Sequence, residues 1–326
     1  MKTLLAGINT KRILLSFAVL LTAYSLQLKT YSLFAAFKDS GWGVRPLGMA
    51  GAFTAVADDA NAPLYNPAGF ALVKGEEVSL MSANLYSGLE GVDIGLTYMG
   101  YVHSLGKNSG GIGFAWGALS SPGLYREDTV SLGYGIGLNN LFKFSGPRIS
   151  IGANARYLKH AYTLDERTVG DPVFANGTTA SATTGDAGII VGLPKQGLAF
   201  ALAARSATSP DVGLLTVDKV PEENVFGVSY HTDKLSYLKF SDFTTALDVV
   251  SRDNNVDVRL GFETWFFNDK FAVRAGARPQ DITFGLGYSV KFASKTELIV
   301  DYSFAWPLEI ENTTGSHRIG LSIRFP

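Results

Sequence analysis

The sequence of 326 residues contains no cysteine, and only 17% of its residues are charged. The absence of cysteine excludes disulfide bonds and thiolate metal sites. With 28 basic and 29 acidic residues the formal net charge is -1, which argues against a nucleic-acid binder, because such a protein needs a basic surface. The histidines lie far apart and show no ligand spacing, so we expect no metal site and no cofactor; they are His103, His160, His231 and His317.

Long apolar runs are scarce, and the one exception lies near the N-terminus. The stretch "ILLSFAVLLTAYSLQL", residues 13–28, follows Lys2, Lys11 and Arg12, and small residues come after it. This order predicts that residues 1–36 are an export signal peptide. A transmembrane anchor is the alternative, although the stretch is slightly short for one. No later run approaches the roughly 18–20 apolar residues of a spanning helix.

Glycine and aromatic residues are abundant, with 36 Gly, 21 Phe and 14 Tyr. Many glycines and aromatics with few charges are typical of a β architecture with one apolar surface. From about Glu76 onward the sequence predicts fourteen strands, most of them long enough to cross a bilayer when tilted. They span 76–86, 93–104, 110–119, 128–141, 148–161, 185–192, 197–205, 223–231, 239–250, 255–266, 270–277, 281–291, 296–305 and 317–325.

The predicted strands alternate between apolar and polar or small residues. In "ITFGLGYSVKF", residues 282–292, the apolar Ile, Phe, Leu, Tyr and Val share one face, and Thr, Gly, Ser and Lys share the other. A soluble β-sandwich shows the same alternation. A membrane barrel is favoured by the even number of strands and by long links after the strands at 110–119, 148–161, 197–205 and 296–305, with mostly tight turns elsewhere. Its polar face is also rich in Gly, Ser and Thr rather than Lys and Glu.

The last strand, "HRIGLSIRF", resembles the C-terminal assembly signal of outer-membrane barrels in Gram-negative bacteria. The matching residues are Arg318, Gly320, Ile323 and Phe325, and Pro326 after the aromatic residue is the one departure. The resemblance implies location in the outer membrane. The expected partners are then the barrel-assembly machinery, outer-membrane lipids and detergent-like amphiphiles.

A barrel of fourteen strands is too wide for its own side chains to fill, so something must plug it. The segment "LGMAGAFTAVADDANAPLYNPAGF", residues 47–70, is slim enough to pack against glycine-rich inner walls. We therefore predict a hatch at residues 37–75 and a barrel at residues 76–326. A surface helix and loop that lead into the sheet are the alternative.

Residues 43–71, "GVRPLGMAGAFTAVADDANAPLYNPAGFA", resemble the N-terminal motif of the FadL-type superfamily of outer-membrane proteins. The compact form of the motif is closer to the PorV/PorQ-type branch than to true fatty-acid transporters. The resemblance implies an all-β, 14-stranded antiparallel transmembrane barrel whose hatch blocks the lumen. The implied hatch signature is Asn66, Pro67, Ala68 and Gly69.

No set of residues points to catalysis. The pair Asp58 and Asp59 is expected on a charged face of the hatch or at a helix end. Other charges alternate onto the face assigned to the lumen, where they either pair with one another to hold the hatch or offer an arginine to the carboxylate of an amphiphile. These are Arg156, Asp248, Asp257, Arg259, Glu263, Arg274, Arg278 and Asp301.

The third predicted strand is rich in glycine and is followed by proline. These residues either bend the strand and open a lateral gap in the wall or belong to an ordinary loop entry. They are Gly110, Gly111, Gly113, Gly117 and Pro122.

Together these observations predict a FadL-like outer-membrane barrel that binds or passes hydrophobic small molecules of the fatty-acid or hydrocarbon type, without being an enzyme. The alternative is a PorV-like protein-secretion partner or carrier, which would add secretion-system proteins to the expected partners. A soluble exported β protein is the third interpretation.

Overall fold

The computed structural model describes residues 36–37, 41–106, 108–142, 146–233, 240–253, 255–293 and 295–326. The predicted signal peptide, residues 1–36, lies outside the described residues except for Ala36. Within the described part of the chain, no helix combines the length and the apolar character that crossing a membrane requires.

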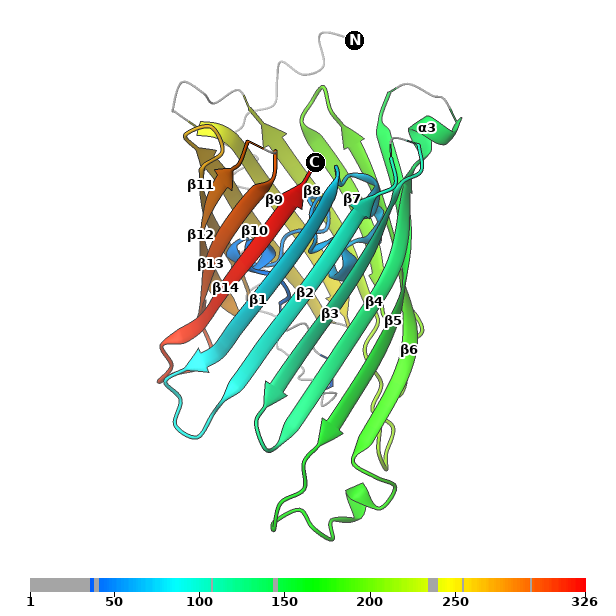
Figure 1. The fold of residues 1–326 in the computed structure, drawn as a ribbon. Helices are drawn as coiled ribbons and strands as arrows, with labels where there is room; N and C mark the ends of the chain where they lie inside the picture. The colour runs from blue at the N-terminus through cyan, green and yellow to red at the C-terminus, as the bar shows by residue number, and fades with distance from the viewer. Residues whose placement is uncertain are drawn as a thin grey trace. The chain divides into compact units, whose positions relative to one another are not determined.

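Fourteen antiparallel strands close into a barrel, in which each strand pairs with its neighbours in sequence and β1 pairs with β14 (Figure 1). This confirms the predicted all-β, 14-stranded antiparallel barrel. The strands are β1 Glu76–Ser87, β2 Ile94–Ser104, β3 Gly111–Ser121, β4 Tyr125–Gly137, β5 Arg148–Tyr162, β6 Thr179–Leu193, β7 Leu198–Arg205, β8 Glu223–Thr232, β9 Phe240–Arg252, β10 Asn255–Phe266, β11 Phe271–Arg278, β12 Asp281–Lys291, β13 Glu297–Pro307 and β14 Gly315–Phe325.

Three details differ from the sequence prediction. β4 ends at Gly137, where the short helix α3, Leu138–Phe142, begins. β6 begins at Thr179 rather than at 185, because its first residues are small and give no hydrophobic alternation. The link after β3 is a tight turn rather than a long loop. There Pro122 and Gly123, whose φ is 74°, occupy the central positions, and Leu124 N–H donates to the Ser121 carbonyl at 3.0 Å.

The wall follows the two-residue period of a pleated strand. In β12 the apolar side chains of Ile282, Phe284 and Leu286 are exposed on the outer surface, whereas Thr283 and Ser289 are buried on the inner side. The same alternation exposes Val300 and Tyr302 on β13 and Ile319 on β14. On these strands the outer surface is therefore apolar and the inner surface is made of polar and small residues, whereas β1 and β2 direct Met81, Leu85, Leu96 and Tyr98 inward.

Residues 41–73 lie inside the barrel, and we call them the inner segment (Figure 1). They form α2, Val44–Gly48, and two short 3-10 helices, η1, Ala62–Leu64, and η2, Pro67–Ala71. Side chains are excluded at many inward glycines of the wall, because an added Cβ would overlap with the inner segment. These are Gly100, Gly111, Gly113, Gly117, Gly135, Gly152, Gly188, Gly261, Gly276 and Gly320. The inner segment therefore contacts the wall from β2 round to β14.

The two ends of the barrel differ. The first contains the start of β1, the end of β14 and α3, and we call it the C-terminal end (top of Figure 1). The second contains the long connections 163–178, with η3, Pro172–Phe174, and 206–222, and we call it the loop end. Val212 and Val220 of the second connection pack with Leu158 on the inner face of β5, so this loop folds back against the inner side of the wall.

Candidate functional site

The hatch signature forms a tight structural unit around Asn66, which is fully buried. Its backbone is extended, with φ -155° and ψ 110°, as expected before a proline. The side chain caps η2 by accepting a hydrogen bond from Ala68 N–H at 3.0 Å, and its amide donates to the Thr54 carbonyl at 3.0 Å. Gly69 has an ordinary φ and is required because a side chain there would overlap with the Ala57 carbonyl.

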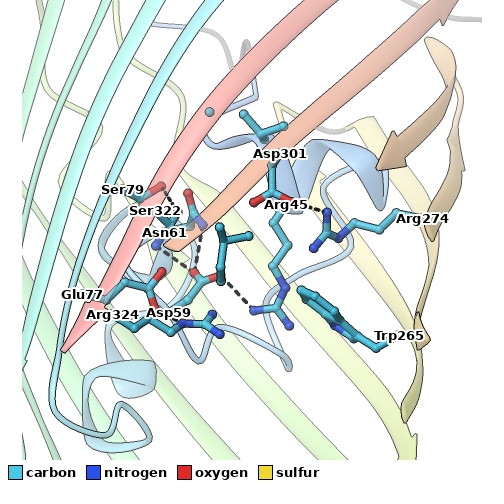
Figure 2. Close-up of a pocket in the computed structure, with 13 residues that line it drawn as sticks. Arg45, Asp59, Asn61, Glu77, Ser79, Trp265, Arg274, Asp301, Ser322 and Arg324 are labelled. Carbon is cyan, nitrogen blue, oxygen red and sulfur yellow. Dashed lines mark hydrogen bonds and ion pairs between the residues drawn. The ribbon is translucent and has the colours of Figure 1, made fainter. Parts of the chain in front are cut away.

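A small cavity lies at the C-terminal end, between the inner segment and the wall (Figure 2). Three arginines and three carboxylates line it, and Figure 2 shows Arg274 pointing toward Asp301, and Arg324 beside Glu77. The arginines come from the inner segment, β11 and β14, so the cavity lies where three separate parts of the chain meet.

Every arginine of this cavity is held by short ion pairs. Arg45 contacts Asp58, Asp59 and Glu263 at 2.6–2.8 Å. Glu263 also receives Arg274 Nε at 2.6 Å, and Arg274 reaches Asp301 at 2.6 Å. Arg324 contacts Glu77 at 2.7 Å. Breaking a buried pair by removing one partner typically costs about 3–5 kcal/mol, so this network ties the inner segment to the wall.

The middle of the inner segment is held by one carboxylate. Asp248 of β9 is fully buried and accepts hydrogen bonds from the backbone N–H groups of Phe53 and Thr54 at 3.1 and 3.0 Å. Arg259 lies opposite Asp248 in the β9–β10 register and is also buried. A charge-assisted hydrogen bond to a backbone N–H is stronger than a neutral one, so Asp248 fixes the turn before Ala55.

A second, larger cavity lies at the loop end. One part of its lining is apolar and includes Phe37, Trp42, Leu64, Leu158 and Pro221. The cavity therefore offers apolar side chains beside its polar ones.

The polar lining of the loop-end cavity contains Arg156, Arg205 and Arg252, with Glu127 and Glu223. Arg252 pairs with Glu223 at 2.5 Å, but Arg205 lies 3.5 Å from the same carboxylate. Arg156 pairs with Asp186 at 2.6 Å. Ion pairing at this end is therefore uneven, with Arg205 the most loosely held. In the loop that covers this end, burial raises the pKa of the Asp218 carboxyl.

The predicted lumen-facing charges divide into separate groups. The structure brings Glu263, Arg274 and Asp301 together at the C-terminal end. Asp248 and Arg259 lie side by side in the wall, and Arg156 lies at the loop end. Arg278 pairs with Asp281 at 2.7 Å, and Asp257 accepts a hydrogen bond from Gln280 at 3.2 Å. They do not form one site.

The glycines of β3 do not mark a gap in the wall. β3 pairs continuously with β2 and with β4 from Gly111 to its end, without a register shift. Gly111 and Gly113 face inward and leave room for Phe70, and Gly117 leaves room for Trp42. Gly110 lies just before the strand with φ 71°, and Pro122 lies in the turn after it. The bend, one of the two interpretations of these residues, is absent from the paired part of β3, where the glycines allow close packing against the inner segment.

The residues of the predicted assembly signal all lie on β14. Arg318 and Gly320 face inward, and a side chain at Gly320 would overlap with Val44 of the inner segment. Phe325 is exposed on the outer surface, and Ile323 shares that face. Their role in assembly stays a prediction.

Several residues of the two cavities were missed in the sequence. Arg205 ends the alternating strand "LAFALAAR" on the same face as Ala201 and Ala203, so its parity could have identified it. Arg45 had no such signal, because the inner segment has no regular period. No group of three or more His, Asp or Glu that could hold a metal ion occurs among the residues that the structure describes.

The chain matches no protein-family model and none of the curated proteins. Solved structures share its fold. A TodX deltaS2S3 mutant, described as a monoaromatic hydrocarbon channel, is 11% identical over 88% of this chain and 99% of the other, with a TM-score of 0.51. The deltaS2 mutant of the same channel is 11% identical over 88% of this chain and 97% of the other, with a TM-score of 0.50. The CymD monoaromatic hydrocarbon channel is 14% identical over 88% of this chain and 97% of the other, with a TM-score of 0.49. The two TodX structures show that this chain shares their barrel fold.

Proposed function

We propose that this protein is an outer-membrane barrel of the FadL-type superfamily that passes hydrophobic small molecules, of the hydrocarbon or fatty-acid type, without changing them chemically. The single observation that supports this most is the group of apolar side chains that line the loop-end cavity, because they offer a hydrophobic surface inside a closed barrel. The apolar outer surface supports a place in a bilayer, where only a closed barrel or a helix satisfies its backbone hydrogen bonds.

In this proposal residues 1–36 direct export and the inner segment acts as the hatch. The ion pairs of Arg45 support this role, because they attach the inner segment to β10 at the C-terminal end. A molecule that enters at the loop end then meets a closed lumen until the hatch moves. The fold shared with the TodX channel, whose name describes monoaromatic hydrocarbons, supports apolar molecules as the transported class.

Transport can be tested by filling the loop-end cavity. Leu158 lines the cavity and is 1% exposed, so Leu158→Trp should obstruct it. Cells that carry the protein in their outer membrane should take up labelled ethylbenzene faster than cells with Leu158→Trp. The matched control is Leu132→Trp, since Leu132 is 61% exposed on the outer surface. Equal uptake by the parent protein, Leu158→Trp and cells without the protein would contradict the proposal.

A second candidate is a PorV-like partner or carrier in protein secretion. The observation that favours it is the exposure of apolar side chains on the loops of the loop end, among them Val169, Leu215, Val217 and Leu308. Exposed apolar groups at loop tips suit contact with another protein. Under this function, replacing Val169 and Val217 by serine should abolish the secretion of a cargo protein and leave ethylbenzene uptake unchanged. Unchanged secretion would exclude it.

A further inference from the structure

The loop-end cavity has an aromatic side that continues toward the outside. Phe37 and Trp42 line the cavity, and the Phe37 ring lies 6.1 Å from His160 in an edge-on arrangement. From His160 the row continues through Tyr125 and Tyr162 to Phe174 in η3, with centroid distances of 5.8, 4.7 and 5.6 Å. Rings at these separations attract a further ring by offset stacking or edge contacts.

The same cavity lining also has hydrogen-bond donors without acceptors. Arg205 is 5% exposed, and its Nε finds no hydrogen-bond partner among the described residues. Its hydrogen-bond contacts are long, at 3.5 Å to Glu223 and 3.4 Å to Thr54 Oγ1, and its guanidinium lies over the Tyr65 ring, 5.5 Å from the centroid. Arg156 Nε, in the same lining, has no acceptor among these residues either. A buried donor without an acceptor is unfavourable, so a ligand that brings acceptor oxygens would gain affinity here.

The two glutamates of the cavity lining do not accept hydrogen bonds from Arg205 Nε or Arg156 Nε. Glu223 is engaged by Arg252 at 2.5 Å. Glu127 accepts hydrogen bonds from Tyr125 Oη at 2.8 Å and from Phe37 N–H at 3.0 Å. Asp186 pairs with Arg156 through Nη2 at 2.6 Å, and Arg156 Nε still has no acceptor among the described residues.

From these contacts we propose that the loop-end cavity binds a small aromatic carboxylate, with its ring against Phe37 and Trp42 and its carboxylate on Arg205 and Arg156. This inference names the ligand class of the site and rests on the proposed function. The planar guanidinium fork matches a carboxylate by two parallel hydrogen bonds. A saturated acid of the same size would gain the carboxylate contacts but would lose the ring contacts.

The test measures the dissociation constants of three matched probes on the full mature chain in lipid nanodiscs, with empty nanodiscs subtracted. The probes are 4-ethylbenzoate, the neutral and similarly shaped 4-ethylnitrobenzene, and the non-aromatic 4-ethylcyclohexanecarboxylate. We expect 4-ethylbenzoate to bind roughly tenfold to a hundredfold more tightly than the nitro compound, because it adds charge-assisted hydrogen bonds. It should bind roughly twofold to tenfold more tightly than the cyclohexane acid.

Variants then assign the contact. Arg205→Gln should remove the preference for 4-ethylbenzoate over 4-ethylnitrobenzene, and Arg156→Gln should weaken it. The second variant keeps the test possible if Arg205→Gln does not assemble. The control is Arg167→Gln, because Arg167 lies on the exposed β5–β6 loop with its side chain 81% exposed. Equal loss in the control would assign the effect to general surface charge and overturn the proposal.

The remaining outcomes separate this inference from the proposed function. If 4-ethylnitrobenzene binds as tightly as 4-ethylbenzoate, the carboxylate is not recognised. If the cyclohexane acid or decanoate binds as tightly, the aromatic ring is not recognised. In these cases ethylbenzene uptake that still depends on Leu158 would preserve the proposed function. Loss of that dependence would remove the proposed function itself.

Discussion

The two ends of the lumen hold the inner segment in different ways. At the C-terminal end, Arg45 and Arg274 share Glu263, and every arginine that lines the cavity has at least one partner within 2.8 Å. At the loop end Arg252 and Arg156 are paired at 2.5 and 2.6 Å, but the hydrogen-bond contacts of Arg205 are 3.4–3.5 Å long, and apolar side chains make up part of the lining. A dense ionic network resists movement, while loosely held donors beside apolar groups leave room for a ligand. We infer that the inner segment is anchored at the C-terminal end and that ligands enter at the loop end.

The largest effect on ion conduction is expected from deleting residues 41–69, because the deletion removes the inner segment from both ends of the lumen. The strand ladder closes without these residues, because β1 pairs directly with β14. The deletion variant should therefore still assemble and should conduct ions steadily in planar bilayers, whereas the full mature chain stays mostly closed. A deletion variant that assembles but is as silent as the parent would show that the inner segment does not plug the barrel.

Matched substitutions at the two ends give the next largest effect. Glu263→Gln removes the carboxylate that Arg45 and Arg274 share, which should cost up to about 3–5 kcal/mol and produce intermittent openings in planar bilayers. Glu223→Gln at the loop end should leave the barrel closed and tighten the binding of 4-ethylbenzoate, since it removes a negative charge from that cavity. Glu90→Gln, on an exposed turn, is the control. Openings of equal frequency in both cavity variants would refute the difference between the ends.

A smaller effect is expected between the ends, where the inner segment packs on glycine. A side chain at Gly188 would overlap with Asn66 Oδ1, so Gly188→Ala should cost about 1–3 kcal/mol by overpacking and displace η2. Gly137 has open space around it, so Gly137→Ala is the matched control. Thermal unfolding of the purified barrels should separate the two variants. Identical unfolding temperatures for the two variants would mean that Gly188 does not pack closely against Asn66.

The smallest effect on the lumen is expected at the outer surface of the C-terminal end. Phe325→Ala should lower the yield of assembled barrel more than Phe304→Ala, because Phe325 occupies the aromatic position of the assembly signal. Phe325 is exposed and Phe304 is half-buried, both on the outer face, so the barrels that do assemble should remain closed. Heat-modifiable mobility in gels measures the yield. Equal yields from the two variants would remove the argument for the assembly signal.

The sequence by itself determined the number of strands, most of their bounds and the orientation of their faces. The period of two is local, so "ITFGLGYSVKF" specifies which side chains of β12 point outward without reference to any other strand. The start of β6 was missed because its alternation is between small residues. The pre-proline conformation of Asn66 was also predictable, because it depends on one neighbour.

Only the tertiary structure decided which charges meet. Arg45 and Glu263 are separated by 218 positions, and no local pattern relates an irregular inner segment to a strand so far along the chain. The glycines of β3 show the same limit, since their sequence fits a bent strand equally well, and only the positions of Phe70 and Trp42 reveal that they make room for packing. Periodic elements encode their own faces, but contacts between an aperiodic segment and the wall depend on how the closed barrel places them.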